Sequence, residues 1–232
     1  MKRSQVNQSI DEAESFFRQH HFALPPFAHW TPQDWETLGP EVDEIRERRL
    51  GWDVTDFNSG SFEEIGLTAF TLRNGKRSVG AGQKSYAEKI LFIRQNQVTP
   101  FHRHFVKTED IINRCAVNGG LLVVQLYNAG PNESFAQTPV RISCDGVVKT
   151  LAAGDSVILG PGESLTVTPD LYHSFHAVEG PALIGEVSSA NDDDNDNRFH
   201  VAIPRYSSIQ EDELPSRLLC NEYPIASCAS IA

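Results

Sequence analysis

After Gly51 the sequence breaks into short β-prone runs separated by Gly, Asn, Asp and Pro, and no long helical pattern interrupts them up to about residue 190. Short strands joined by turns close into two packed sheets or a small barrel, whereas a parallel α/β sheet needs helices between its strands. The sequence therefore predicts a mainly β protein, built as a double-sheet jelly roll or small barrel. The runs are 52–57, 67–72, 86–93, 121–127, 140–143, 147–151, 156–159, 165–168, 174–177 and 183–187.

Two dipeptides between these runs are typical of tight hairpins. Asn74-Gly75 and Asp145-Gly146 combine residues that adopt positive φ with little strain, as two-residue hairpin turns require. We expect a tight antiparallel turn at each.

The first fifty residues have a different, helical pattern. The spacing of apolar residues predicts an amphipathic helix over 4–20, which Pro25-Pro26 must follow rather than interrupt. Thr31 before Pro32 has the cap-then-proline signature of a second, short helix, and 41–48 predicts a third turn or two. We expect these helices to pack on the outside of a sheet.

The chain of 232 residues is expected to form one domain. We assign 1–50 to an N-terminal helical extension, 51–190 to the β-barrel core and 191–232 to a loop and C-terminal segment. The polar, acidic run at 191–197 predicts a solvated loop. The remaining tail is expected to pack back on the barrel.

The charge balance argues against polyanionic partners. The chain has 20 Lys and Arg against 31 Asp and Glu, a net charge of −11, which repels nucleic acid and anionic membrane surfaces.

The four cysteines of the chain match no zinc or redox spacing, so we expect reduced thiols. The N-terminus lacks the apolar core of a signal peptide and no stretch is long enough to span a membrane, which predicts a cytoplasmic protein.

A candidate metal site lies between residues 99 and 110. His102 and His104 are two residues apart, so on a strand both rings leave the same face, and a turn could return Glu109 toward them. Two nitrogens and an oxygen suit Mn, Fe, Co, Ni or Zn. A strand with two exposed histidines and a charged turn is the alternative for an isolated motif of this kind.

A fourth candidate ligand, His173, follows a Gly-rich stretch far along the chain. Taken with His102, His104 and Glu109, it resembles the two-part signature of the cupin superfamily, in ligand type and in order. The glycine after the glutamate stands further along than usual, and the second motif lacks its customary glycine. The resemblance implies a cupin double-stranded β-helix, a jelly-roll barrel, with these four residues as metal ligands. His176 falls off the expected ligand face and is expected to pack.

The resemblance becomes narrower in the segments around these motifs and covers the chain from the N-terminal helix nearly to the C-terminus. These segments are similar to the D-lyxose ketol-isomerase family of cupin-type sugar isomerases. The similarity implies interconversion of D-lyxose with D-xylulose, with some tolerance for D-mannose and D-fructose. It also implies Mn²⁺ as cofactor, a small sugar as partner and a homodimer. The matching segments are 86–89, 102–114, 185–188, 194–199 and 220–224.

Such an exchange moves a proton between two carbons through an enediol and needs a Lewis acid and a base. For the base we choose Glu186, which shares a strand face with Ile184, so that desolvation inside an apolar barrel would raise its proton affinity. A strand-end glutamate facing water is the alternative. Lys107, between two ligands, is expected to donate to a sugar oxygen with its pKa lowered by the neighbouring cation. A solvated turn lysine is the alternative.

Lys89 stands in a run whose two faces are otherwise largely apolar, so either Lys89 or Glu88 should point inward. We assign Lys89 as a sugar-hydroxyl contact or as a partner of Glu109 or Glu186.

Asp196 and Arg198, in and after the acidic run, are expected to close over the substrate. Simple surface ion pairing is the alternative for both residues.

Two other functions use the same ligands. An Fe(II) cupin dioxygenase is one, although four protein ligands leave less room for substrate and oxygen than a facial triad does. A non-catalytic sugar-binding or structural cupin is the other. The presence of all four ligands together with Lys107 and Glu186 weakens that second reading.

Overall fold

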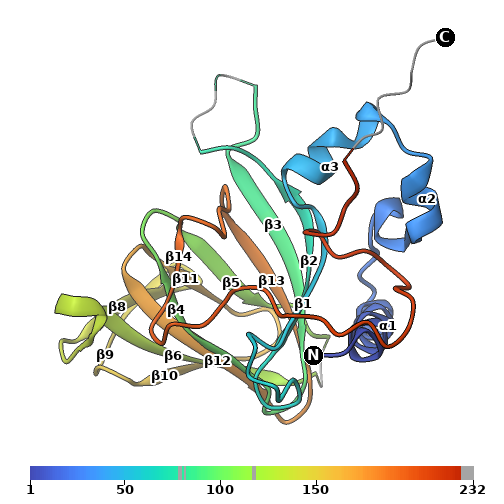
Figure 1. The fold of residues 1–232 in the computed structure, drawn as a ribbon. Helices are drawn as coiled ribbons and strands as arrows, with labels where there is room; N and C mark the ends of the chain where they lie inside the picture. The colour runs from blue at the N-terminus through green and yellow to red at the C-terminus, as the bar shows by residue number, and fades with distance from the viewer. Residues whose placement is uncertain (78–79, 81, 117–118, 226–232) are drawn as a thin grey trace.

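Two antiparallel sheets face each other and curl into a barrel in this computed structural model, which describes residues 1–77, 80, 82–116 and 119–225 (Figure 1). The larger sheet has the order β1 (Gly51–Thr55), β2 (Leu67–Asn74), β3 (Tyr86–Ile93), β13 (Ala182–Ser189), β5 (Glu109–Asn113), β11 (Ser164–Val167), β8 (Val140–Cys144) and β9 (Val147–Leu151). The smaller has the order β10 (Ser156–Leu159), β6 (Leu121–Ala129), β12 (Leu171–Val178), β4 (Val98–His104) and β14 (Asn197–Phe199), with β7 (Phe135–Ala136) beside β6.

The period-two pattern of the strands places the core between the sheets. In β6, Leu122, Val124 and Leu126 are fully buried, while the residues between them are partly exposed. The facing sheet contributes Leu165 and Ile142 to the same core. The predicted mainly β cupin jelly roll is confirmed.

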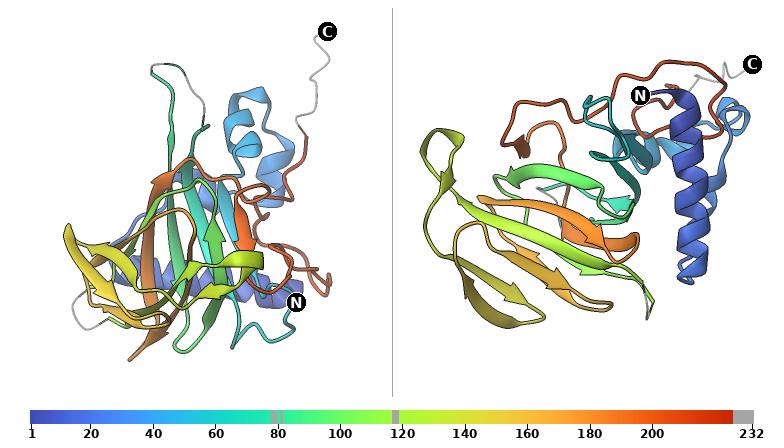
Figure 2. Two further views of the ribbon diagram at one scale, coloured as in Figure 1. Left: turned by 90° about the vertical axis from the view of Figure 1, so that its left-hand side faces the viewer. Right: turned by 90° about the horizontal axis from the view of Figure 1, so that it is seen from below.

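The N-terminal helices lie outside the barrel, beside β1 and β2, as predicted (Figures 1 and 2). In α1 (Arg3–Gln19), Phe17 stacks on Trp52 of β1 with ring centroids 6.2 Å apart, and Trp52 Nε1 donates to the carbonyl of Ala28. The Thr31 hydroxyl accepts from the Asp34 amide and caps the second α-helix as expected. The other helices are η1 (Pro26–His29), α2 (Pro32–Glu36), η2 (Pro40–Val42), α3 (Asp43–Glu47) and η3 (Pro131–Glu133).

One hairpin prediction is confirmed and the other is wrong. Asp145 and Gly146, both at positive φ, join β8 to β9 as a tight turn. At Asn74-Gly75 the chain does not turn, because the Gly75 amide still bonds to the Tyr86 carbonyl at 3.0 Å and the ladder continues. A Cβ on Gly75 would lie 2.0 Å from the Lys84 carbonyl oxygen, so this glycine permits a close approach of two extended segments.

The C-terminal segment folds back as expected, although it packs on α1 as well as on β1. Leu219 bridges to Trp52, and the guanidinium of Arg3 pairs with both Glu211 and Glu222.

Cys115, Cys144 and Cys220 are buried free thiols, and Cys228 lies outside the described residues. Among the described helices, none combines the length and apolar content needed to cross a membrane.

Candidate metal centre and active site

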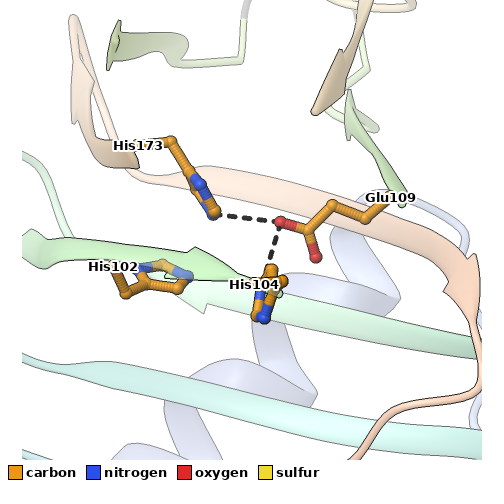
Figure 3. A group of neighbouring side chains, drawn as sticks. All are labelled: His102, His104, Glu109 and His173. Atoms are coloured by element: carbon orange, nitrogen blue, oxygen red, sulfur yellow. Dashed lines mark ion pairs between the residues drawn. The ribbon is translucent and has the colours of Figure 1, made fainter. Parts of the chain in front are cut away.

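Three strands from both sheets bring the four predicted ligands to one point inside the barrel. His102 and His104 leave the same face of β4, and His173 on β12 is the direct cross-strand partner of His102. A turn after His104 leads into β5, which presents Glu109 from the larger sheet. Figure 3 shows the side chains converging, with the His104 and His173 rings directed at the Glu109 carboxylate.

The four donor atoms are close enough to share one ion. All lie within 4.8 Å of one another. Glu109 Oε1 is 3.0 Å from Nε2 of His173 and 3.5 Å from Nε2 of His104. Three of these residues are fully buried, and His102 is partly exposed at the cavity.

Backbone carbonyls orient the three imidazoles with their Nε2 atoms toward the centre. The Nδ1 atoms lie 2.9 to 3.1 Å from backbone oxygens, so each Nδ1 carries the proton and each Nε2 keeps a lone pair. The Nε2 atoms of His104 and His173 are buried without a hydrogen-bond partner among the described residues. Unpaired buried acceptors directed at one point are what a metal site requires. The carbonyls belong to Pro100, Asp196 and Leu171.

The ionisation states also fit a divalent cation. Burial lowers the pKa of His102 well below its usual value, helped by the neighbouring His173, and burial with Lys107 lowers the pKa of His104. Burial alone would raise the pKa of Glu109, but the charge of Lys107 together with the contacts of His104 and His173 outweighs it and holds that pKa well below the ordinary value. Two neutral imidazoles and one carboxylate are thus already in the forms that bind metal.

Lys107 connects the ligands to Glu186. Its Nζ lies 2.5 Å from Glu109 Oε2 and 2.9 Å from Glu186 Oε1, with the side chain 2% exposed. Burial would lower the pKa of Lys107, yet the two carboxylates raise it above its ordinary value. The lowering expected from a bound cation stays a prediction, and these two carboxylates, which the sequence could not place, act against it.

A line of alternating charges continues across the larger sheet. Glu186 Oε1 is 3.6 Å from Lys89, which lies opposite it on β3, and Lys89 is 3.9 Å from Asp193. Arg205 then pairs with Asp193 at 3.7 Å and with Asp53 on β1. Lys89, rather than Glu88, points inward. It pairs with Glu186, which is one of the alternatives predicted for it.

Sequence reasoning missed Asp53, Asp193 and Arg205. They come from β1 and from loops after β13, and no short motif joins them. Burial would raise the pKa of Asp193, but Lys89 and Arg205 lower it below its ordinary value. The prediction of a fully solvated acidic loop is wrong for Asp193 and Asp196, which turn inward to meet buried cations and amides.

Asp193→Asn is expected to lower the free energy of unfolding at pH 7 by about 3 kcal/mol, because it leaves Lys89 and Arg205 short of a buried partner. A carboxyl group with a lowered folded-state pKa stabilises the fold above its unfolded pKa of about 3.9 and loses that effect as pH falls. The difference between wild type and variant should therefore shrink below about pH 4. Urea unfolding from pH 7 to pH 3 measures it, and a difference that stayed constant would contradict the assignment.

A cavity of about 40 Å³ adjoins the ligands. His102, Lys107 and Glu186 line it on the metal side, and aromatic rings cover other parts of its wall. The space admits about three water molecules, so a sugar must displace surrounding side chains. Asp193 borders both this cavity and a surface cleft of about 380 Å³, so the two spaces adjoin at that side chain.

Asp196 organises the turn that carries Lys107. Its carboxylate accepts from the amides of Phe105, Val106 and Lys107 at 2.8 to 2.9 Å, and its backbone carbonyl accepts from His104. The side chain is buried and is not among the residues that line the cavity. The predicted substrate contact of Asp196 stays a prediction, and the observed contacts are with the turn and with Arg77, whose guanidinium lies 2.5 Å from the carboxylate.

Asp196→Ala is expected to weaken metal binding by about tenfold, because the turn between two ligands loses its anchor. The unpaired amides should also lower the free energy of unfolding by about 2 kcal/mol. Metal titration and urea unfolding measure both effects. Asp194→Ala is the matched control, since Asp194 is exposed and, among the described residues, pairs only with Arg49 at 2.9 Å. Equal behaviour of the two variants would refute the assignment.

Arg198 is not brought to the cluster. Its side chain is 55% exposed, and its Nε lies 3.8 Å from Oε1 of Glu133 in η3. This is the surface ion pair that stood as the alternative, and a contact with substrate stays a prediction. His176 likewise lies outside the ligand group, as expected.

The fold and the four-ligand centre together define a cupin-type barrel with a candidate metal site. L-ribose isomerase of Acinetobacter sp. DL28, solved in complex with L-ribose, superposes with a TM-score of 0.57 at 12% identity, covering 87% of this chain and 93% of that one. L-ribose isomerase of Cellulomonas parahominis gives a TM-score of 0.55 at 15% identity, covering 90% and 98%. These likenesses concern the fold.

The sequence comparisons identify the family. The family model for D-lyxose isomerase matches residues 1–223. The D-lyxose/D-mannose isomerase of Serratia proteamaculans is 48% identical over 226 residues, and that of Escherichia coli O157:H7 is 47% identical over 226 residues. Each alignment covers 96% of this chain and 98% of the relative. The chain belongs to the D-lyxose isomerase family, and the prediction of an isomerase is confirmed.

Proposed function

We propose that the protein is a metal-dependent aldose–ketose isomerase that interconverts D-lyxose and D-xylulose, with D-mannose and D-fructose as a second pair. One observation carries the proposal: the ligand cluster, with two unpaired Nε2 atoms, lies beside the buried Lys107–Glu186 pair. Relatives named D-lyxose/D-mannose isomerase support the choice of sugars. Membership of an isomerase family favours this function over a dioxygenase or a non-catalytic barrel.

We propose Mn²⁺ as the cofactor, held by His102, His104, Glu109 and His173. The mixed nitrogen and oxygen set also suits Co²⁺, Fe²⁺, Ni²⁺ or Zn²⁺. Once bound, the ion would supply Lewis-acid polarisation of the oxygens on the reacting carbons, which makes the neighbouring C–H group more acidic.

In this scheme Glu186 is the base that takes the proton from C2 of the aldose and returns it to C1. Its carboxylate lines the cavity and is ionised, since burial would raise its pKa but Lys107 and Lys89 lower it. The rise in the pKa of Glu186 expected from desolvation is therefore absent while the carboxylate is paired with the two lysines. The hydroxyl proton of O2 must also pass to O1. Lys107 donates a proton to O1, which gains charge as the enediol forms, and takes one back from O2, while Lys89 holds Glu186 from the other side.

Three further parts of the assignment are proposals of the same kind. They are a homodimer, a cytoplasmic location and a single domain with an N-terminal extension at 1–50, a core at 51–190 and a last segment at 191–232. Light scattering, cell fractionation and limited proteolysis test them in turn.

The function is tested by stripping the protein of metal, restoring single divalent ions without oxygen and assaying a panel of aldoses and ketoses. We expect D-lyxose to give D-xylulose with Mn²⁺ and to give nothing without metal. Oxygen uptake with no isomerisation would support the dioxygenase alternative instead. Tight sugar binding with no turnover under any metal would support the non-catalytic one.

A further inference from the structure

We propose that Thr99 and Arg205 form a subsite that binds the hydroxyl groups of the sugar chain beyond its two reacting carbons. The inference rests on the proposed isomerase function and adds the residues that hold the rest of the substrate. Both side chains line the same cavity as Glu186 and two of the proposed metal ligands, His102 and His104.

Thr99 lies on β4, three residues before the first metal ligand. It is 2% exposed, and its Oγ1 is buried without a hydrogen-bond partner among the described residues. Its backbone carbonyl is already engaged, because it accepts from the Ser174 hydroxyl at 2.8 Å. The side chain therefore presents an unused hydroxyl, which can both donate and accept, to the cavity wall.

Arg205 presents an unused donor to the same space. Its Nη2 donates to Asp53 and its Nε faces Asp193 at 3.7 Å, so two of its nitrogens are held by carboxylates. Its Nη1 is buried and has no hydrogen-bond partner in the part of the chain that the structure describes. The two carboxylates fix the plane of the guanidinium and leave one N–H edge free.

A polyhydroxylated chain satisfies both groups. Unpaired buried donors and hydroxyls are costly, so their presence in one cavity wall indicates a polar ligand. Sugar hydroxyls accept from Arg205 and exchange hydrogen bonds with Thr99. The remaining wall contains Leu67, Leu91 and Phe175, whose apolar surfaces suit the C–H groups of a sugar.

The position of the subsite indicates which hydroxyls it binds. Glu186 must face C1 and C2, and Lys89 and Asp193 separate it from Arg205 along the line of charges. Arg205 thus lies at the end of the cavity that is farther from the reacting carbons. We assign O4 and O5 of the open-chain aldose to this end.

The test combines steady-state kinetics with equilibrium binding of D-arabinitol, a pentitol without a carbonyl, to the metal-loaded protein. Thr99→Val keeps the shape and removes the hydroxyl, and Arg205→Lys keeps the charge and removes Nη1. We expect each to raise KM for D-lyxose and Kd for D-arabinitol about tenfold, with kcat changed less than about threefold. Thr99→Ser should restore wild-type values.

Thr68→Val is the matched control. Thr68 is a buried strand threonine whose hydroxyl bonds to Ser9, away from the cavity, so this variant should lose stability without changing KM or Kd. D-Lyxose analogues lacking O4 or O5 sharpen the assignment. When the hydroxyl that a residue binds is already missing from the analogue, Thr99→Val or Arg205→Lys should raise KM little above the wild-type KM for that analogue.

Unchanged KM and Kd in both Thr99→Val and Arg205→Lys, in a protein that isomerises D-lyxose, would overturn the subsite and leave the proposed function intact. Absence of isomerisation by the wild-type, metal-loaded protein would remove both. A fall in kcat with KM and Kd unchanged would also contradict the assignment, because it places these residues in the chemical step.

Discussion

Glu186→Gln is expected to lower kcat for D-lyxose about a thousandfold while metal content stays at the wild-type level. The amide keeps the size of the side chain and cannot take a proton from C2, and general-base groups commonly contribute factors of this order. Glu186 contacts Lys107 and Lys89 but is not among the metal ligands, so the ion should remain bound. Turnover and metal analysis of the same sample measure the effect.

Glu88→Gln provides the matched control for this change. Glu88 lies one residue before Lys89 on the same sheet, but it pairs with Arg73 at 3.1 Å and is about one-third exposed. This variant should keep kcat within about twofold. Near-normal turnover of Glu186→Gln would refute the assignment of the base and point to another group in the cavity.

His173→Ala should weaken metal binding more than about a hundredfold and abolish activity in the presence of stoichiometric metal. Removing a ligand should weaken metal binding by more than the tenfold to hundredfold that is typical when a residue supporting a ligand is removed. His173 is completely buried, and its Nε2 is 3.0 Å from Glu109 Oε1, so the variant leaves an empty position beside the other ligands.

His176→Ala is the control on the same strand, since His176 lies outside the ligand group. Metal titration followed by equilibrium dialysis should show that the His176→Ala variant binds metal with wild-type affinity. Full metal occupancy in His173→Ala would remove this histidine from the centre.

The parts of the site that follow from local periodicity could be predicted from the sequence. His102 and His104 share a strand face because side chains alternate along a strand, and Glu109 follows after one turn. His173 was recognised from its motif, and its position opposite His102 follows from the pairing of β4 with β12. A register shifted by one residue would have turned it away from the centre.

The parts that depend on long-range packing could not be predicted. Asp53 and Arg205 meet across 152 residues, and nothing near either one indicates the partner. The predicted pKa of Lys107 assumed a lone cation nearby, whereas two carboxylates from different strands contact its amine. Asp196 is expected to close over the substrate from the acidic loop, and nothing in the sequence indicates that amides of the β4–β5 turn donate to its carboxylate.

The most direct test of the account is isomerisation of D-lyxose in D₂O by the Mn²⁺-loaded protein without oxygen, followed by NMR of the product. Proton transfer through an enediol predicts D-xylulose whose C1 carries deuterium in the fraction of turnovers in which the Glu186 carboxyl exchanges with solvent before it returns the proton, and no product from metal-free protein. No D-xylulose at all, or equal D-xylulose from the metal-free protein, would contradict the account.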